Sequence, residues 1–332
     1  MKRHRSARRG SNSSPMAALA EATAAASETM RELVASGSAP AVSAAVVVQG
    51  RVVFAGAAGS AGGEPCTTEG TLFYTASISK TVTALACLQA AERGELNIDA
   101  DVSTYVGQRV RNPHFEEAVL TLRHLLQHRS GLSDSEAALL PGRWRSESGE
   151  CETTLAEYVR ERLLPGGGSY EPLLWSRDLP PGQAGYHYSN AGFALAGWVL
   201  ECATGRSLAS LATERVFEPL GMGRSAFSLR EATDGRGTVA APSPPGRVYG
   251  VAEYPAAALL STAADLSRYL LALTAPPEAC PLLRPASLRE LLPESFTGGL
   301  AWWGRDSQYG DRRGQLWSHG GFMQGVRTHT HV

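Results

Sequence analysis

The sequence predicts an α+β fold in which a helical domain divides a sheet into two separate parts of the chain. Two β-branched apolar runs near the N-terminus, residues 42–48 and 51–55, have the character of strands. Between Ser77 and about residue 290, apolar residues recur mostly with helical spacing. Strand signals return only close to the C-terminus. The first strands are therefore expected before the helices and the last strands after them.

The elements follow in order. Ser14-Pro15 is a typical cap and first-turn pair, and Gly37 is a typical residue after a helix end, so a helix is expected between them. Gln49-Gly50 joins the two apolar runs and predicts a β-hairpin. Helices are then predicted at residues 77–93, 121–127, 154–164, 191–203, 208–216 and 263–273. The late strands are predicted at residues 299–303, 315–318 and 324–331.

The bulk composition is that of an ordinary globular chain. With 332 residues, of which 43% are hydrophobic, the chain can bury a substantial core. A formal net charge of −1 argues against a nucleic acid partner, and no apolar run approaches the length of a membrane span. Five cysteines without a C-x-x-C pair predict reduced thiols. An intracellular location is favoured, and the oligomeric state is left open.

Residues 1–15 differ from the rest of the chain. No acidic residue occurs before Glu21. The segment carries the basic residues Lys2, Arg3, Arg5, Arg8 and Arg9. An Arg- and Ser-rich, acid-poor start is typical of a disordered tail, and an organellar transit segment is the alternative. No apolar stretch follows the basic residues, so a secretory signal is not expected.

The motif Ser77-Ile78-Ser79-Lys80 points to chemistry. A hydroxyl and an amine three residues apart share one face of a helix. A serine alcohol is a poor nucleophile and needs a proton acceptor within hydrogen-bond reach, which Lys80 can provide. The N–H groups at a helix N-terminus would also favour an oxyanion beside Ser77. Taken alone, the motif favours a simpler interpretation, a capped helix start with a solvated lysine.

Two further motifs follow it, Tyr188-Ser189-Asn190 and His319-Gly320-Gly321. In this order the three motifs resemble the serine β-lactamase and penicillin-binding protein superfamily, in particular its class C-like branch of esterases, D-aminopeptidases and β-lactamase-related proteins. Further similar segments are residues 121–132, 181–182, 188–197 and 218–222. The resemblance covers residues 16–332 and implies an antiparallel sheet flanked by helices, plus an inserted all-α domain. Residues 16–76 and 291–332 would form the sheet part, and residues 77–290 the mainly helical part.

The resemblance also implies roles for single residues. Ser77 would be the acylated nucleophile, Lys80 its proton partner, and Tyr188 a phenolic general base and acid. Asn190 would donate to a substrate carbonyl, and His319-Gly320-Gly321 would form the edge strand beside the cleft. The backbone N–H groups of Ser77 and Phe322 would form the oxyanion hole. Free lysine and tyrosine both have pKa values near 10, so which of them takes the serine proton is left open.

Position 319 bears on the substrate. β-Lactamases and peptidoglycan peptidases of the superfamily usually carry a lysine there, a permanent cation suited to a substrate carboxylate. Histidine is mostly neutral at pH 7, so the carboxylate anchor is weaker in this chain. The expected substrates are small esters, amides or short peptides, with at most weak β-lactam hydrolysis.

No metal or organic cofactor is expected. His124 and His128 are four residues apart on a predicted helix, but no glutamate follows His124 as in a metalloprotease motif, so both are interpreted as packing or surface residues. His329 and His331 lie on the same side of a terminal strand and are interpreted as exposed.

Two departures from the family pattern remain. Relatives commonly have two glycines within residues 254–262, where this chain has alanines, and alanine would be harmful only if positive φ or a close approach to a ligand were needed. The chain also ends at Val332, soon after the third motif, where relatives continue with a further strand and a helix. The alternative to a hydrolase is therefore a catalytically impaired family member that acts as a binding or assembly protein.

Overall fold

The computed structural model describes residues 15–134, 144–170, 172–233, 238–240, 248–293, 298–309, 312–323 and 325–332. The predicted N-terminal tail lies outside these residues except for Pro15. Of the helices in the described part of the chain, none combines the length and apolar character that crossing a membrane would require.

The N-terminal part has the predicted helix and hairpin. Helix α1 (Pro15–Ala35) is followed by Gly37 in the left-handed conformation, and it packs on strands β1 (Ala41–Val48) and β2 (Arg51–Ala61). Gln49 and Gly50 both have positive φ, 49° and 73°, which is the backbone geometry of a tight hairpin turn. The hairpin prediction is confirmed, and strand β3 (Glu64–Pro65) extends this antiparallel sheet.

Helix α2 (Ser79–Glu92) is the centre of the molecule. Residues 79–90 of this helix are all buried, which explains why it lacks a polar face and why its apolar residues show little periodicity. A single turn of 3-10 helix, η1 (Ala76–Ile78), joins it to strand β4 (Thr71–Tyr74). The predicted helix start at Ser77 was therefore two residues early, because Ser77 lies in this tighter turn.

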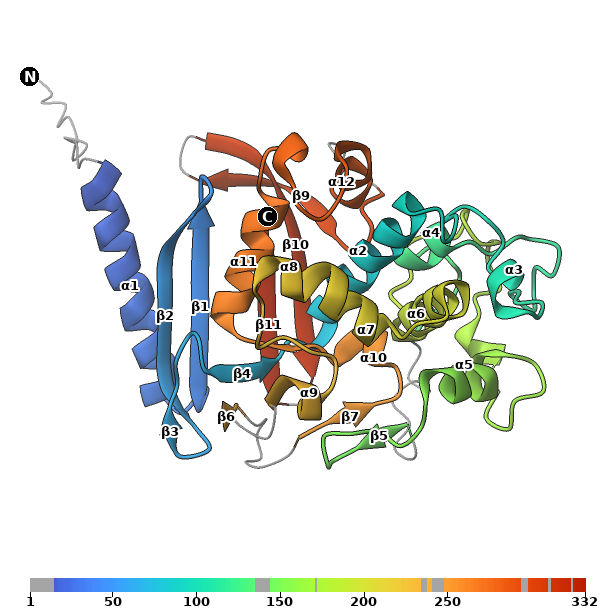
Figure 1. Ribbon diagram of the computed structural model, residues 1–332, viewed down its shortest axis with the longest axis horizontal. Helices are drawn as coiled ribbons and strands as arrows, with labels where there is room; N and C mark the ends of the chain where they lie inside the picture. Colours follow the sequence, from blue (N-terminus) through green and yellow to red (C-terminus); the bar gives the residue numbers. More distant parts are fainter. Residues whose placement is uncertain are drawn as a thin grey trace, which may run out of the picture.

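The remaining helices lie further along the chain than α2 (Figure 1). The helices are α3 (Ser103–Val106), α4 (Leu122–Leu126), α5 (Leu155–Leu163), α6 (Asn190–Thr204), α7 (Leu208–Ala212), α8 (Glu218–Leu220), α9 (Leu229–Thr233), α10 (Tyr254–Ala257), α11 (Ala263–Leu273) and α12 (Pro285–Leu291). Of these, α6, α7, α10 and α12 pack against α2. The strands among them are β5 (Arg145–Ser146), β6 (Thr238–Val239), β7 (Gly250–Val251) and β8 (Leu260–Ser261). Strand β4 pairs with β6 and β8, and β5 pairs with β7.

The C-terminal strands form a second three-stranded antiparallel sheet in the order β11-β10-β9. Strand β9 is Trp303–Tyr309, β10 is Arg312–Met323 and β11 is Val326–His331. The predicted strand at residues 299–303 was wrong except for its last residue. Ala301 has a φ of 64° and its N–H donates to Leu126 O of α4, so the backbone there is bent rather than extended.

The α+β prediction is confirmed, with one difference in the sheet. Among the described strands, β1-β2-β3 and β11-β10-β9 are two separately hydrogen-bonded sheets rather than one. Figure 1 shows β1 and β2 beside α1 and α11 at one end of the molecule, and α3 to α6 at the other end, with the C-terminal strands between them. Helices from the middle of the chain therefore meet strands from its end next to η1.

The alanines that replace glycines of the family pattern are accommodated without strain. They lie at α10 and just after it, and none of Ala256, Ala257 and Ala258 has a positive φ. Alanine is an ordinary helix residue at such positions. The backbone of this segment therefore does not need glycine, and alanine is harmless to its conformation.

Candidate active site

Ser77 lies at the strained junction between β4 and α2. The preceding residue, Ala76, is fully buried and has a φ of 49°, a conformation that L-residues other than Asn and Asp rarely adopt. The Ser79 hydroxyl donates to Ala76 O at 2.6 Å, and Thr75 N donates to Leu259 O at 2.8 Å, so both sides of the turn are held. These contacts support a bent backbone that presents Ser77, which is 8% exposed, at the start of α2.

Lys80 is completely buried, and its Nζ lies among three oxygen atoms. The nearest are Asn190 Oδ1 at 2.5 Å, Ala256 O at 2.9 Å and Ser77 Oγ at 3.2 Å. Burial lowers the pKa of Lys80 to about 7, although the negative charges of Asp134 and Glu253 oppose this change. A large share of Lys80 is therefore the neutral amine at neutral pH.

Tyr188 reaches Ser77 from the segment before α6. Its hydroxyl donates to Ser77 Oγ at 2.6 Å and lies 3.5 Å from Asn190 Oδ1. The Nζ of Lys80 lies 4.8 Å from the centre of the Tyr188 ring. Burial raises the pKa of the Tyr188 phenol above its ordinary value, and the hydrogen bond with Ser77 opposes this only in part. The phenol is therefore protonated at neutral pH.

Residues 128–134 of the same chain hold the Tyr188-Ser189-Asn190 motif in place. Asp134 N donates to Tyr188 O at 3.2 Å, and the Asp134 carboxylate accepts from the backbone N–H of Asn190 at 2.7 Å and of Ala191 at 3.4 Å. The carboxylate thus caps the N-terminus of α6, where a negative charge is favoured. Sequence reasoning missed Asp134. The family-like segment 121–132, which ends two residues before it, was the available signal.

His128 also belongs to this site and not to the protein surface. It is 2% exposed, and its ring contacts Tyr188 with a centroid separation of 4.7 Å. Of the two interpretations of His128, packing or surface, the structure shows packing. Sequence reasoning did not connect His128 with Tyr188. His124 is placed elsewhere, because its Nδ1 accepts from Thr121 N at 3.4 Å in the capping box of α4.

His319 is buried in β10 and neutral. Its Nδ1 lies 2.8 Å from Gly320 O, and because a carbonyl can only accept, Nδ1 carries the hydrogen. The ring packs against Trp303 with the ring centroids 4.4 Å apart and the planes tilted by 34°. Among the described residues its Nε2 has no hydrogen-bond partner. Burial and the neighbouring Lys80 lower the pKa of His319 to about 3. The expectation of a neutral group at this position agrees with this environment.

Gly321 brings β10 against the Ser77 turn. A Cβ atom at this position would lie 2.2 Å from Thr328 Oγ1 and 2.4 Å from Thr75 O, so only glycine allows this approach. The Thr328 hydroxyl donates to Thr75 O at 2.7 Å and joins β11 to the same turn. The close packing of β10 against Thr75 and Thr328 therefore explains why the last residue of the His-Gly-Gly motif is glycine.

The backbone N–H of Phe322 projects from the free edge of β10. Trp317 and Val332 exchange both backbone hydrogen bonds, at 2.9 and 2.7 Å. In an antiparallel pair such residues alternate with residues whose backbone N–H and C=O point away from the partner strand. The alternation turns the Phe322 N–H away from β11. On the other side, β9 pairs with β10 only as far as Ser318, and no other described strand pairs there. The Phe322 side chain is 71% exposed and contacts Arg327.

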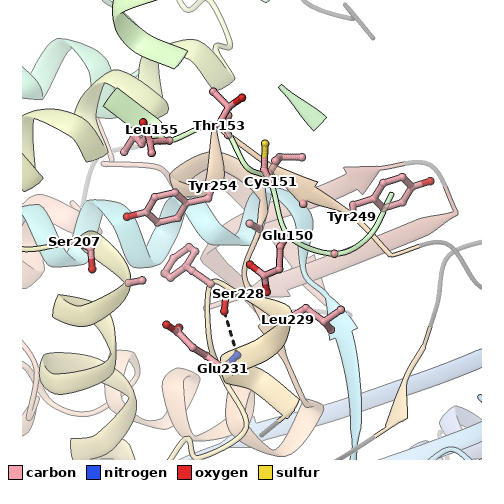
Figure 2. Close-up of a pocket in the computed structure, with 18 of the residues that line it drawn as sticks. Glu150, Cys151, Thr153, Leu155, Ser207, Ser228, Leu229, Glu231, Tyr249 and Tyr254 are labelled. Atoms are coloured by element: carbon pink, nitrogen blue, oxygen red, sulfur yellow. Dashed lines mark hydrogen bonds between the residues drawn. The ribbon is translucent and has the colours of Figure 1, made fainter. Parts of the chain in front are cut away.

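A separate cavity of about 330 Å³ lies beside Tyr254 of α10 (Figure 2). Tyr254 lines it, whereas the carbonyl of Ala256 in the same helix accepts from Lys80. The lining includes none of the residues described above as neighbours of Ser77. The candidate active site is thus the junction of η1, α6 and β10 and not this cavity.

Comparison with known proteins gives the family. A family model described as Beta-lactamase matches residues 26–332. Esterase EstB of Burkholderia gladioli is 34% identical over 179 residues, which are 49% of this chain and 40% of the esterase. A D-aminopeptidase of Cereibacter sphaeroides is 36% identical over 110 residues, 33% of this chain and 19% of that protein. The chain matches half or less of the length of these curated relatives.

Solved structures share the fold. The octameric penicillin-binding protein homologue from Pyrococcus abyssi superimposes with a TM-score of 0.72 at 23% identity, over 96% of this chain and 71% of that one. The D-amino acid amidase from Ochrobactrum anthropi SV3 superimposes with a TM-score of 0.69 at 23% identity, over 93% of this chain and 86% of the amidase. A class C β-lactamase from Rhodobacter sphaeroides superimposes with a TM-score of 0.66 at 20% identity, over 94% of this chain and 90% of the β-lactamase. Because the family model spans residues 26–332, this chain belongs to the β-lactamase family.

Proposed function

We propose that the protein is a serine hydrolase that forms an acyl-enzyme on Ser77 and releases the acyl group to water. One observation carries the proposal: the Ser77 Oγ lies 2.6 Å from a protonated phenol, that of Tyr188, and 3.2 Å from an amine with a pKa of about 7, that of Lys80. A serine next to a group that can accept its proton near neutral pH is an activated nucleophile.

The hydrogen bonds favour Lys80 as the proton acceptor. Asn190 Oδ1 and Ala256 O accept from Lys80, so the neutral amine directs both of its hydrogens to them. Its lone pair is then left for the third neighbour, Ser77 Oγ. The raised pKa of Tyr188 makes a phenolate base unfavourable, and its O–H donates to the same Oγ.

The reaction would proceed in two halves. Ser77 Oγ bonds to the substrate carbonyl carbon while its proton passes to Lys80, and the carbonyl oxygen becomes an oxyanion near the N–H groups of Ser77 and Phe322. The bond to the leaving group then breaks, and the leaving group takes a proton from the Lys80 and Tyr188 pair. A water molecule then adds to the acyl carbonyl carbon and gives a proton to Lys80. The bond to Ser77 Oγ breaks, and Ser77 Oγ takes a proton back from the Lys80 and Tyr188 pair. One oxyanion donor is typically worth about 2.7–4 kcal/mol of transition-state stabilisation.

The proposed substrates are small esters, amides or short peptides. A neutral His319 packed against Trp303 offers no permanent cation for a substrate carboxylate, which argues against efficient β-lactam hydrolysis. Relatives named as an esterase, a D-aminopeptidase and a D-amino acid amidase agree with this class of substrate.

Intact mass spectrometry would test the proposal. The purified chain is incubated with activated esters, amides and a β-lactam, with Ser77→Ala as the control and circular dichroism as the check of folding. The expected result is one covalent adduct with an ester or amide, absent from Ser77→Ala. A folded chain that never forms an adduct would instead support the alternative, a non-catalytic binding protein.

A further inference from the structure

His128 lies two residues after the end of α4, in an unusual conformation. Its backbone is left-handed, with a φ of 55°, a conformation that is unfavourable for a residue with a Cβ. Its side chain is buried, and among the described residues its Nε2 has no hydrogen-bond partner. A buried unsatisfied N–H is destabilising as well. Both features are unfavourable for folding, and the contacts that His128 makes with the Tyr188 segment offset them.

Two hydrogen bonds connect His128 to the residues on either side of Tyr188. His187 N donates to His128 O at 2.8 Å, and Ser189 N donates to His128 Nδ1 at 3.0 Å. Because a backbone N–H can only donate, Nδ1 must be unprotonated. Burial lowers the pKa of His128 well below its ordinary value, which keeps Nδ1 in this state.

The ring of His128 also limits the movement of the Tyr188 ring. The two rings are tilted by 30° with centroids 4.7 Å apart, and the His128 ring packs as well against Phe193 of α6 at 5.0 Å and Tyr186 at 5.4 Å. One side chain therefore constrains Tyr188 through its flanking backbone and through its ring. Rigid support of this kind is what keeps a catalytic group within a fraction of an ångström of its working position.

We propose that His128 is a positioning residue that holds the Tyr188 hydroxyl on Ser77 Oγ. The inference rests on the proposed serine hydrolase and extends it by a residue that acts only through Tyr188. The Nδ1 of His128 is engaged by Ser189, and its Nε2 bonds to no described group, so it does not act on Ser77 directly.

A double-mutant cycle tests the proposal. His128→Leu removes the acceptor and the aromatic contact, and its acylation rate is measured with an activated ester in the Tyr188 and Tyr188→Phe backgrounds. A misplaced catalytic group typically loses roughly 10²-fold in rate, so a loss of this order is expected with Tyr188 present, in kcat rather than KM. In the Tyr188→Phe background, the same change should have almost no further effect, because no hydroxyl remains to be positioned.

Two further variants sharpen the cycle. His128→Asn keeps an acceptor near Nδ1 and tolerates positive φ, so it should lose less than His128→Leu and again only with Tyr188 present. It also carries the test if His128→Leu does not fold. His124→Leu is the matched control, since His124 caps α4 without contacting Tyr188, and any loss there should be equal in both backgrounds. Equal losses for the His128 variants in both backgrounds would overturn the proposal.

A crystal structure of His128→Leu distinguishes failure of this proposal from failure of the proposed function on which it rests. If the wild-type chain is never acylated, the hydrolase proposal fails, and the position of Tyr188 in His128→Leu still gives a result. A Tyr188 hydroxyl displaced from Ser77 Oγ would support the positioning role. A hydroxyl that stays at 2.6 Å would contradict it.

Discussion

The Tyr188 hydroxyl donates a 2.6 Å hydrogen bond to Ser77 Oγ, although 111 residues separate the two along the chain. The contact depends on two supports. The strained Ala76 turn presents Ser77, and the segment 128–134 holds the motif that contains Tyr188. A reactive centre assembled in this way responds to changes in residues that never touch a substrate.

The rate should depend on pH through Lys80. Its pKa of about 7 means that the amine is neutral above this pH, so kcat/KM should rise through a single ionisation near pH 7 and level off above it. Asp134→Asn removes a negative charge that raises the pKa of Lys80, so this rise should move to lower pH. Measured kcat/KM profiles of both proteins check the prediction, and an unmoved or upward-moved midpoint would contradict it.

Tyr188→Phe should lower the acylation rate by about 10²- to 10⁴-fold, the usual contribution of a positioned proton donor or acceptor. The fold should be unchanged, because only the hydroxyl is lost. Tyr186→Phe is a suitable control, since Tyr186 lies on the same segment, is 51% exposed and packs against Trp303 rather than Ser77. Stopped-flow acylation of both variants gives the answer, and similar losses in the two would argue against a special role for Tyr188.

Gly321→Ala should damage both activity and stability. The added Cβ would meet the backbone oxygen of Thr75 at 2.4 Å, which forces β10 away from the Ser77 turn and displaces the Phe322 N–H. Gly320→Ala provides the comparison, because its Cβ would meet only the His329 ring, at 3.4 Å. Thermal unfolding and kcat are the measurements. A loss of about 10²-fold in kcat is expected for Gly321→Ala and much less for Gly320→Ala.

His319→Lys should destabilise the protein instead of creating a carboxylate site. The position is fully buried, and a second ammonium would lie close to Lys80, whose charge already lowers the pKa of His319. We expect the Tm of His319→Lys to fall by several degrees, which corresponds to a loss of about 2 kcal/mol in the free energy of unfolding for a chain of this size. His329→Lys, at an exposed position of β11, is the control and should be tolerated. A stable His319→Lys with faster turnover of carboxylate-bearing substrates would refute this reading of the position.

The local elements were predictable from short stretches of sequence. The turn Gln49-Gly50 and the flanking β-branched runs predicted the hairpin, and the helix at residues 263–273 was predicted with the bounds that α11 has. Both depend on contacts between neighbours in the chain, so a few residues contain the information. The strand at residues 299–303 was wrong because the bend at Ala301 is stabilised by a distant partner, Leu126.

The sequence by itself determined the family pattern, the order of the three motifs and the spacing that places Ser77 beside Lys80. Only the tertiary structure decided the electrostatics: burial of Lys80 lowers its pKa to about 7 and burial of Tyr188 raises the pKa of the phenol, which distinguishes two groups with nearly equal values in water. It also brought Asp134 and His128 to the tyrosine motif. The physical reason is that spacing along a helix is a local property, whereas desolvation and backbone hydrogen bonding depend on every segment that packs around the site.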